Sequence, residues 1–438
     1  MRKLLKIILR SLWASIRTIR KGALGCVTEN VQDYDDFSDD IKAYLAKKTL
    51  ELATKKLRFY QVGDKFPLGK GEGRTFKIVK YARINLPQSS LTEGVTPNGS
   101  SMTISSVTAI AEQWGAYVTL SDVSILTITH PVLTKANELL GKQAAETVDR
   151  EVQQVLEGAT NIQYADKDNV QTNDSRDDLA AEDVLCTAEL QLALANLRNN
   201  GAPEYDDMYL GILDPSVEMD VTNDTKWVAA AEYSNIKALY AGEVGQWFSI
   251  RWLRSNFVQK YVGIAAVSVT TDSTASTLTA ADHDIVVVGR NKVTGFDERI
   301  STIVAQTPTV SESIAVTMPS DTDYTYDVYC GLTSGHLAKL TTLTDQVASD
   351  SVIVSAIGTG AAAPIAPTAT VTVHNVWVFG KGAFGVTELS KIVRTLTPSV
   401  ASDSDPLEQR RKTGWKAFFK AVILNNAFMR KIECGSAF

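Results

Sequence analysis

The stretch SSLTEGVTPNGSSMTISSVTAIAEQWGAYVTLSD, residues 89–122, is the most informative part of this sequence. From Ser101 to Thr119 apolar and polar residues alternate as they do in a β-strand. The part before it carries the turn formers Gly94, Pro97, Asn98 and Gly99. Together with the alternating run 75–84, the stretch predicts a hairpin with arms at 75–84 and 101–119. A two-stranded ribbon is only marginally stable in water, so we expect it to lie on a further surface.

The composition indicates a folded protein without redox or metal chemistry. The 438 residues are 44% hydrophobic and 21% charged, which suffices for two or three domains. Because the net charge is −6, any contact with nucleic acid has to be local. The four cysteines, at positions 26, 186, 330 and 434, are far apart and predict neither disulfide staples nor a zinc site. No nucleophile–base pair or metal-ligand spacing is evident, so we expect no enzyme activity, no cofactor and no metal.

Residues 1–62 are expected to form an N-terminal arm. Residues 1–25 combine apolar residues at helical spacing with basic residues on the other side, which predicts a basic amphipathic helix. An acidic patch at 29–40 and a helix at about 41–56 follow. A cleaved signal is disfavoured because Arg10 interrupts the apolar run, and no run is long enough to span a bilayer. A helix on a membrane surface stays open, but we favour an arm that packs on a partner or on nucleic acid.

Two helices are predicted in the middle of the chain. Residues 131–157 have one apolar face, begin at a proline and end before a glycine. At a rise of 1.5 Å per residue this helix is about 40 Å long. A second helix covers about 180–199, and a strand with a turn at Pro215 comes next. Phe248, Ile250 and Trp252 then alternate with polar residues as in a strand.

Between about residues 259 and 372 the composition shifts to serine, threonine, valine and alanine, with short β-runs between polar turns. In one such run, TYDVYCGLTSG, we expect Tyr324, Tyr326 and Val328 to face one way. Short strands over this length predict an inserted immunoglobulin-like sandwich or small barrel. Its role is open between a receptor-binding module and a stabilising surface domain.

Two glycine-rich stretches resemble the sequence patterns of nucleotide-binding loops, but the secondary structure expected after them does not fit such loops. GKGEG at 69–73 leads into a β-like run, whereas a Walker loop opens a helix. GKGAFG at 380–385 fits G-x-G-x-x-G, but no βαβ unit follows it. Neither stretch predicts a nucleotide site, and the first is expected to be a flexible hinge at the base of the hairpin.

The C-terminal run GWKAFFKAVILNNAFMRKIEC predicts two strands around Asn425 and Asn426. This end of the chain is basic, and its candidates for contact with nucleic acid are Arg410, Arg411, Lys412 and Lys416. Basic side chains also keep exposed strand edges from aggregating, and the sequence does not separate the two roles.

Six motifs in a fixed order make the chain similar to the major capsid proteins of tailed phages. They are LTEGVTP (91–97), WGAYVTLSD (114–122), the long helix ending in EGA, GEVG (242–245), VFGKGAFG (378–385) and DPLEQRRKTGWKAFFKAVILNNAFMRKIE (405–433). Together they span most of residues 40–260 and 374–434. Within the family the chain most resembles the branch of podoviruses that package a virion RNA polymerase. It departs from the family in its basic N-terminal segment and in the size of the β insertion.

The resemblance implies an α+β chain with the Hong-Kong-97-type capsid fold and an inserted all-β domain. After the arm, residues 63–122 would be an extended hairpin loop that reaches over a neighbouring subunit, and 123–179 a peripheral domain with the spine helix. Residues 180–258 would be the first part of the axial domain, 259–372 the insertion, and 373–438 the second axial and peripheral part. The loop residues expected at the contact between subunits are Arg74, Glu93, Gly94, Pro97 and Trp114.

The resemblance also implies self-assembly of pentamers and hexamers into the icosahedral head that encloses the double-stranded DNA of a tailed bacteriophage. Expected partners are further copies of the chain, portal and scaffolding proteins, a decoration protein, and DNA held by the inward-facing basic residues, with no membrane partner. The expected location is the virion, and the host cytoplasm during assembly. The alternative is a secreted or surface-exposed β-rich adhesin, which would need a cleavable signal but neither the long helix nor the ribbon.

Overall fold

The computed structural model describes fourteen segments of the chain: 58–67, 73–81, 101–123, 132–167, 172–223, 246–247, 249–274, 276–309, 312–332, 337–340, 346–347, 350–368, 371–397 and 409–436. It also describes the single residues 84, 86, 90 and 99. The helices expected within 1–25 and 41–56, and the acidic patch between them, lie outside this part. The chain divides into unit 1, residues 1–54, 115–142 and 392–416, and unit 2, residues 55–114, 143–391 and 417–438.

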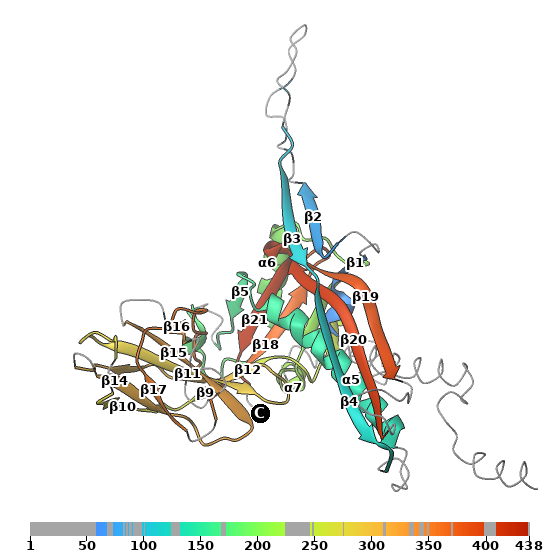
Figure 1. Ribbon diagram of the computed structural model, residues 1–438. Coiled ribbons are helices and arrows are strands. Elements are labelled where there is room, and N and C mark those ends of the chain that lie inside the picture. The colour runs from blue at the N-terminus through green and yellow to red at the C-terminus, as the bar shows by residue number, and fades with distance from the viewer. Residues whose placement is uncertain are drawn as a thin grey trace, which may run out of the picture. The chain divides into compact units, whose positions relative to one another are not determined.

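The class is α+β, as the sequence predicts: a few helices accompany many strands (Figure 1). The helix expected at 131–157 is confirmed as α5, Val132–Leu156. Its buried positions recur at helical spacing: Ala136, Leu140, Ala144, Ala145, Val148, Val152 and Leu156.

Two local predictions in unit 2 were wrong. The helix expected from residue 180 begins only at Thr187, as α6 (Thr187–Asn199). Before it, the Asp183 carboxylate accepts the backbone N–H groups of Ala180 and Lys167, at 2.8 and 3.0 Å, and such local bonds compete with a helix. The turn expected at Pro215 is instead the start of α7, Pro215–Asn223, because proline suits the first helical position.

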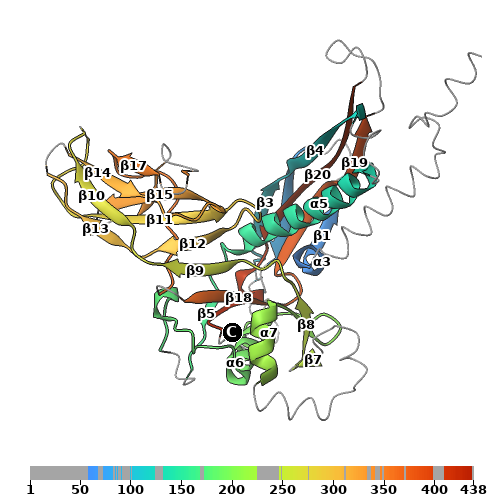
Figure 2. The same cartoon turned by 90° about the horizontal axis from the view of Figure 1, so that it is seen from below.

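The main sheet of unit 2 has the strand order β16-β15-β11-β12-β9-β18-β6-β8-β7, with β13 on β11, and β21 between β18 and β5. Its strands are β5 (Ile162–Tyr164), β6 (Tyr209–Leu213), β7 (Gln246–Trp247), β8 (Ile250–Arg254), β9 (Lys260–Ile264), β11 (His283–Asn291), β12 (Asp297–Ser301), β13 (Val304–Gln306), β15 (Tyr324–Leu332), β16 (Ala338–Lys339), β18 (Thr372–Phe379) and β21 (Met429–Cys434). The helices α6 and α7 lie together against part of this sheet (Figure 2). Their apolar faces pack on Tyr209, Trp252, Val376 and Ile432 of the sheet.

A second, three-stranded sheet lies within residues 259–372 and has the order β10-β14-β17 (Ser268–Asp272, Ser313–Thr317, Ser351–Val354). Its apolar side chains form one core with those of β11 and β15, so two sheets pack face to face here (Figure 2). Tyr326 and Val328 point into this core, and Tyr324 packs against it, as expected. The main sheet itself continues out of this region, because β12 pairs with β9 and β9 pairs with β18.

The hairpin region forms two sheets. β2 (Thr75–Tyr81) and β3 (Ile104–Ile110) make a separate antiparallel pair, seen side by side in Figure 1. The next strand, β4 (Glu112–Ser121), belongs to another sheet, of order β1-β19-β20-β4, with β1 at Asp64–Pro67, β19 at Phe384–Thr397 and β20 at Arg410–Ile423. The single return arm expected at 101–119 therefore breaks at the buried Ala111. The two C-terminal strands expected around Asn425 are confirmed as β20 and β21, joined by the 3₁₀ turn at 426–428.

Candidate functional site

The ribbon of β2 and β3 has one face that is exposed throughout. Residues paired across an antiparallel ladder share a face, and here Tyr81 pairs with Ile104 and Thr75 with Ile110. The exposed fractions on this face are 45% for Val79, 66% for Tyr81, 57% for Ile104 and 53% for Ile110. We call these four side chains the ribbon face. They are in contact with solvent in the single chain and share this side of the ribbon with the polar residues Thr75, Lys77, Ser106 and Thr108.

The opposite face of the ribbon is anchored. Phe76 and Ile78 are half-buried, and the ring centroid of Phe76 lies 5.8 Å from that of Phe66 in β1. Ala109, the cross-strand partner of Phe76, is buried. One face of the ribbon thus holds it to its own chain, whereas the ribbon face does not.

The residues expected at the contact between subunits have different surroundings. Arg74 is exposed at the base of the ribbon, where its Nε and Nη2 each lie 3.4 Å from the Ala111 carbonyl oxygen, and its own carbonyl accepts the Ala111 N–H at 2.9 Å. Trp114 is half-buried, with the guanidinium of Arg150 at 5.8 Å from its ring centroid. These contacts of Arg74 hold the two arms of the ribbon together at its base, within one chain. Glu93, Gly94 and Pro97 lie outside the described residues.

The basic candidates lie on β20, where residues 410, 412 and 416 are exposed and residues 413–415 are buried. Arg410, Lys412 and Lys416 share one face of the strand and are exposed, whereas Thr413 and Trp415 on the other face are buried. The side chain of Arg411 lies outside the described part of the structure. Three candidates therefore form a basic stripe that solvent reaches.

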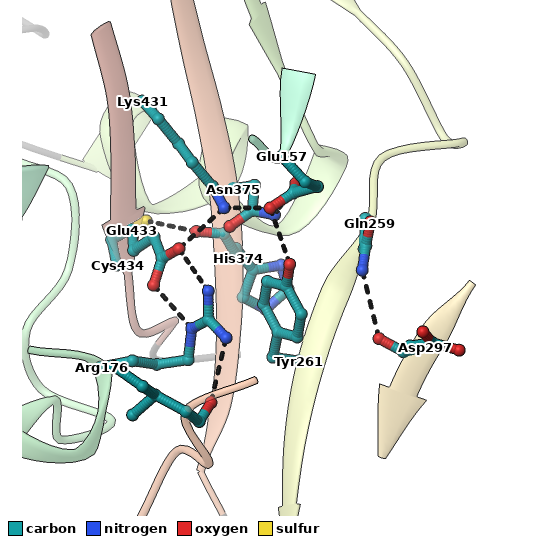
Figure 3. Close-up of polar contacts among 11 residues, drawn as sticks. Glu157, Arg176, Gln259, Tyr261, Asp297, His374, Asn375, Lys431, Glu433 and Cys434 are labelled. Carbon is teal, nitrogen blue, oxygen red and sulfur yellow. Dashed lines mark hydrogen bonds and ion pairs between the residues drawn. The ribbon is translucent and has the colours of Figure 1, made fainter. Parts of the chain in front are cut away.

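Sequence reasoning missed a buried cluster of charges in unit 2 (Figure 3). Arg176 holds Glu433 with two hydrogen bonds, from Nε at 2.7 Å and from Nη2 at 2.6 Å. Lys431 lies 2.8 Å from the same carboxylate and also pairs with Glu157. Lys431 is 1% exposed and Glu433 is fully buried. Residues 176 and 433 are too far apart in the sequence for any local pattern to join them.

The electrostatics of this cluster follow from its pairing. Burial favours the neutral acid, but Lys431 and Arg176 together lower the pKa of Glu433 to about 2. The guanidinium of Arg176 also stacks over the Tyr261 ring, 3.6 Å from its centroid. The charges are compensated inside the core and are not available to a ligand.

A second polar group sits where α7 begins. Asp214 lies 3.2 Å from Nδ1 of His374 and 3.0 Å from Nζ of Lys260. Although burial raises the pKa of Asp214, hydrogen bonds from these two groups hold it below its usual value. These contacts fix β6, β9 and β18 to one another.

GKGAFG lacks the structural context of a nucleotide-binding loop. GKGAFG connects β18 to β19, a second strand and not a helix, so it has no phosphate-binding helix end. Within the described segments no three His, Cys, Asp or Glu side chains gather as metal ligands. None of the described helices is long and apolar enough to cross a membrane.

No protein-family model matches the chain, and no curated protein matches it. Solved structures do match it over most of their length. The capsid of Ralstonia phage GP4 is 11% identical, covers 88% of this chain and 92% of its own, and has a TM-score of 0.49. The acid-stable capsid of Helicobacter pylori bacteriophage KHP30 is 10% identical, with coverages of 87% and 92% and a TM-score of 0.48. The capsid of cyanophage P-SCSP1u is 12% identical, with coverages of 86% and 87% and a TM-score of 0.46.

Proposed function

We propose that this chain is the major capsid protein of a tailed bacteriophage, which self-assembles into the icosahedral head around the double-stranded DNA genome. The observation that carries the proposal is the ribbon face. Val79, Tyr81, Ile104 and Ile110 are about half or more exposed on a two-stranded sheet, an element that is marginally stable without a further layer. A neighbouring copy of the chain supplies that layer.

The six sequence motifs support another copy of the chain as the partner. They resemble motifs of the shell proteins with the Hong-Kong-97-type fold. Two of them coincide with β4, which follows the ribbon in the chain, and with β20, which pairs with β4. In such a shell the ribbon of one copy lies on the next copy, a head-to-tail contact that closes into rings. Each contact is modest, and many of them act together once the lattice closes.

The finer assignments follow from the same proposal. Residues 63–122 are the loop between subunits, 123–179 the peripheral domain, 180–258 with 373–438 the axial part, and 259–372 an insertion. The basic segment with Arg410, Arg411, Lys412 and Lys416 contacts the packaged DNA, where its exposed basic residues offset the net negative charge of the chain. The role is structural and not catalytic. The chain assembles in the host cytoplasm with portal and scaffolding proteins, in the podovirus branch that packages an RNA polymerase.

Electron microscopy of the purified chain tests the proposal, with sedimentation velocity over a series of concentrations. Rings of five or six copies, or closed shells, are expected. A monodisperse monomer at every concentration, with and without added polyethylene glycol as a crowding agent, would contradict it. That result would favour the adhesin alternative.

A further inference from the structure

The exposed face of the paired strands β4 and β20 carries a hollow of about 400 Å³. Its lining residues are 115–117 of β4 and 412–415 of β20. A Cβ added to Gly115 would lie 3.3 Å from the Cβ of Lys416, and one added to Gly414 would lie 2.8 Å from that of Tyr117. Because neighbouring Cβ atoms on paired strands share a face, both glycines lie on the face of these two exposed side chains. The two glycines leave bare strand backbone at the floor of the hollow.

The other face of the same part of β20 is packed against a helix. The hydroxyl of Thr413 donates a hydrogen bond to Oδ1 of Asn137 in α5 at 2.7 Å, and Trp415 is buried. Side chains alternate along a strand, so the residues on either side of Thr413 and Trp415 point the opposite way. The hollow therefore opens on the side of the sheet that solvent reaches.

Two lysines flank the glycine of β20 on this open side. Lys412 and Lys416 are exposed, and neither forms an ion pair with a carboxylate in the described part of the chain. Lys420, further along the same strand, does have such a partner, because it pairs with Glu112 at 3.1 Å. At about 3.3 Å per residue, the two flanking lysines are about 13 Å apart along the strand. The open face thus presents two positive charges with a hollow between them.

The acidic segment at residues 29–40 has the complementary pattern. It carries six carboxylates and neither lysine nor arginine. In an extended chain, residues two apart line one face, which puts Phe37 between Asp35 and Asp39. This spacing of two carboxylates about a ring equals the spacing of the two lysines about the glycine on β20. Both carboxylates reach a lysine when the ring enters the hollow.

The hollow distinguishes this occupant from DNA. Phosphate groups need cations and hydrogen-bond donors, whereas a hollow floored by bare backbone fits an inserted side chain. Residues 41–57 join the acidic segment to Arg58, where the described chain begins, and span at most about 60 Å when extended. A tether of this kind gives the segment an effective concentration of roughly millimolar order at its own chain.

We propose that residues 35–39 dock in the hollow of their own chain and shield its two lysines from DNA. The ring of Phe37 lies over Gly414, and the carboxylates of Asp35 and Asp39 pair with the lysines on either side. The shielding rests on the proposed function, in which the basic segment of β20 contacts DNA. Because exposed ion pairs are weak and salt-sensitive, the concentrated phosphates of packaged DNA displace the segment.

Zero-length cross-linking of the full chain with a carbodiimide tests the docking, because this reagent joins an amine only to a carboxylate in contact with it. Peptide mapping is expected to find Lys412 or Lys416 joined to Asp35 or Asp39 within the monomer. Lys381, an exposed lysine on the connection between β18 and β19, is the control and should not be joined to this segment. The docking is overturned by the absence of these links, by links only between two copies, or by equal links to Lys381.

A variant with an unchanged net charge separates docking from general electrostatic attraction. Phe37→Ser keeps every carboxylate but removes the ring, so the yield of the links should fall several-fold. Tyr34→Ser is the matched control, because residue 34 points away from the face of residues 35, 37 and 39 in an extended chain. It should leave the yield unchanged. An undiminished yield in Phe37→Ser refutes the role of the hollow.

Fluorescence anisotropy with a labelled DNA duplex tests the shielding. Phe37→Ser is expected to bind the duplex about tenfold more tightly than the parent chain, the gain from releasing two exposed ion pairs. Equal affinities of the two chains overturn the shielding and leave the docking in place. If neither chain binds DNA, both the shielding and the DNA contact of the proposed function are wrong. Self-assembly is judged separately, by electron microscopy.

Discussion

Replacing two side chains of the ribbon face tests the origin of assembly most directly. The change is Tyr81→Ser with Ile104→Ser, a directly opposed pair on β2 and β3. Both side chains are more than half exposed in the single chain, at 66% and 57%. The folded chain should tolerate the change, because substitutions at exposed sites usually alter the unfolding free energy by less than about 0.5 kcal/mol. The loss is expected only between copies.

The magnitude follows from the exposed area. A tyrosine offers roughly 200 Å² of surface, so two thirds of it is about 130 Å², worth about 3 kcal/mol at about 25 cal/mol per Å². Burying a whole isoleucine side chain is worth about 1.5–3 kcal/mol, so the exposed half of Ile104 adds about 1 kcal/mol. The sum of about 4 kcal/mol per contact corresponds to roughly a thousandfold weaker association.

The assay is light scattering over a series of protein concentrations, with micrographs of each sample. The double variant should need a concentration several hundredfold higher than the parent chain before particles form. Val293→Ser is the matched control, because Val293 is 92% exposed but lies on the loop between β11 and β12. Particles that form from the double variant and the parent at the same concentration would refute the reasoning about the ribbon face.

Three further predictions concern stability and are checked by chemical or thermal denaturation. Burial raises the pKa of Asp149 to about 7, although hydrogen bonds from two backbone N–H groups oppose this shift. Because the folded chain holds this proton more tightly than the unfolded chain, the stability that Asp149 contributes is fully present below pH 3.8 and is lost as the pH rises through 7. Between these two pH values the unfolding free energy of the parent chain should fall by up to about 4 kcal/mol, and Asp149→Asn should remove this fall. Glu433, whose pKa is lowered to about 2, contributes stability that is present above pH 4.5 and lost as the pH falls through 2; Glu433→Gln should cost about 3 kcal/mol at pH 7 and much less at pH 2. Gly263→Ala would put a Cβ 2.3 Å from the carbonyl oxygen of Thr368 and should lower the unfolding free energy by about 1–3 kcal/mol, whereas Gly99→Ala, with no atom within 4 Å, should change nothing.

The periodicity of apolar residues in the sequence was sufficient to predict the long helix and strand. α5 and β15 were predicted because each repeats its apolar residues over many positions at one period, and each indeed buries that face. α7 was missed because a nine-residue helix has too few turns to establish a period, and its proline was taken for a turn. Apolar alternation also continues from β3 into β4, so it could not indicate that the strands part at Ala111.

The candidate surfaces were only partly predictable, for a related reason. The hairpin and the basic residues of β20 are local in the sequence, so residue types were sufficient to predict a ribbon and a basic strand, although not the break of the return arm at Ala111. The cluster around Glu433 joins a 3₁₀ turn, the end of α5 and three strands, and its members are ordinary charged residues in their own segments. Only the three-dimensional pairing of distant segments gives them a common environment.

The pairing of β12 with β9, and of β9 with β18, bears on how such a chain can evolve. A module joined only by a flexible tether can be lost or exchanged between genomes by a simple recombination event. Here residues 259–372 include β9, which pairs with the start of β18, and their excision would leave Val373 and His374 of β18 without that partner and open to pairing with other chains. Descendants that lose these residues are therefore expected to retain a short strand in place of β9, or to carry charged residues at the start of β18.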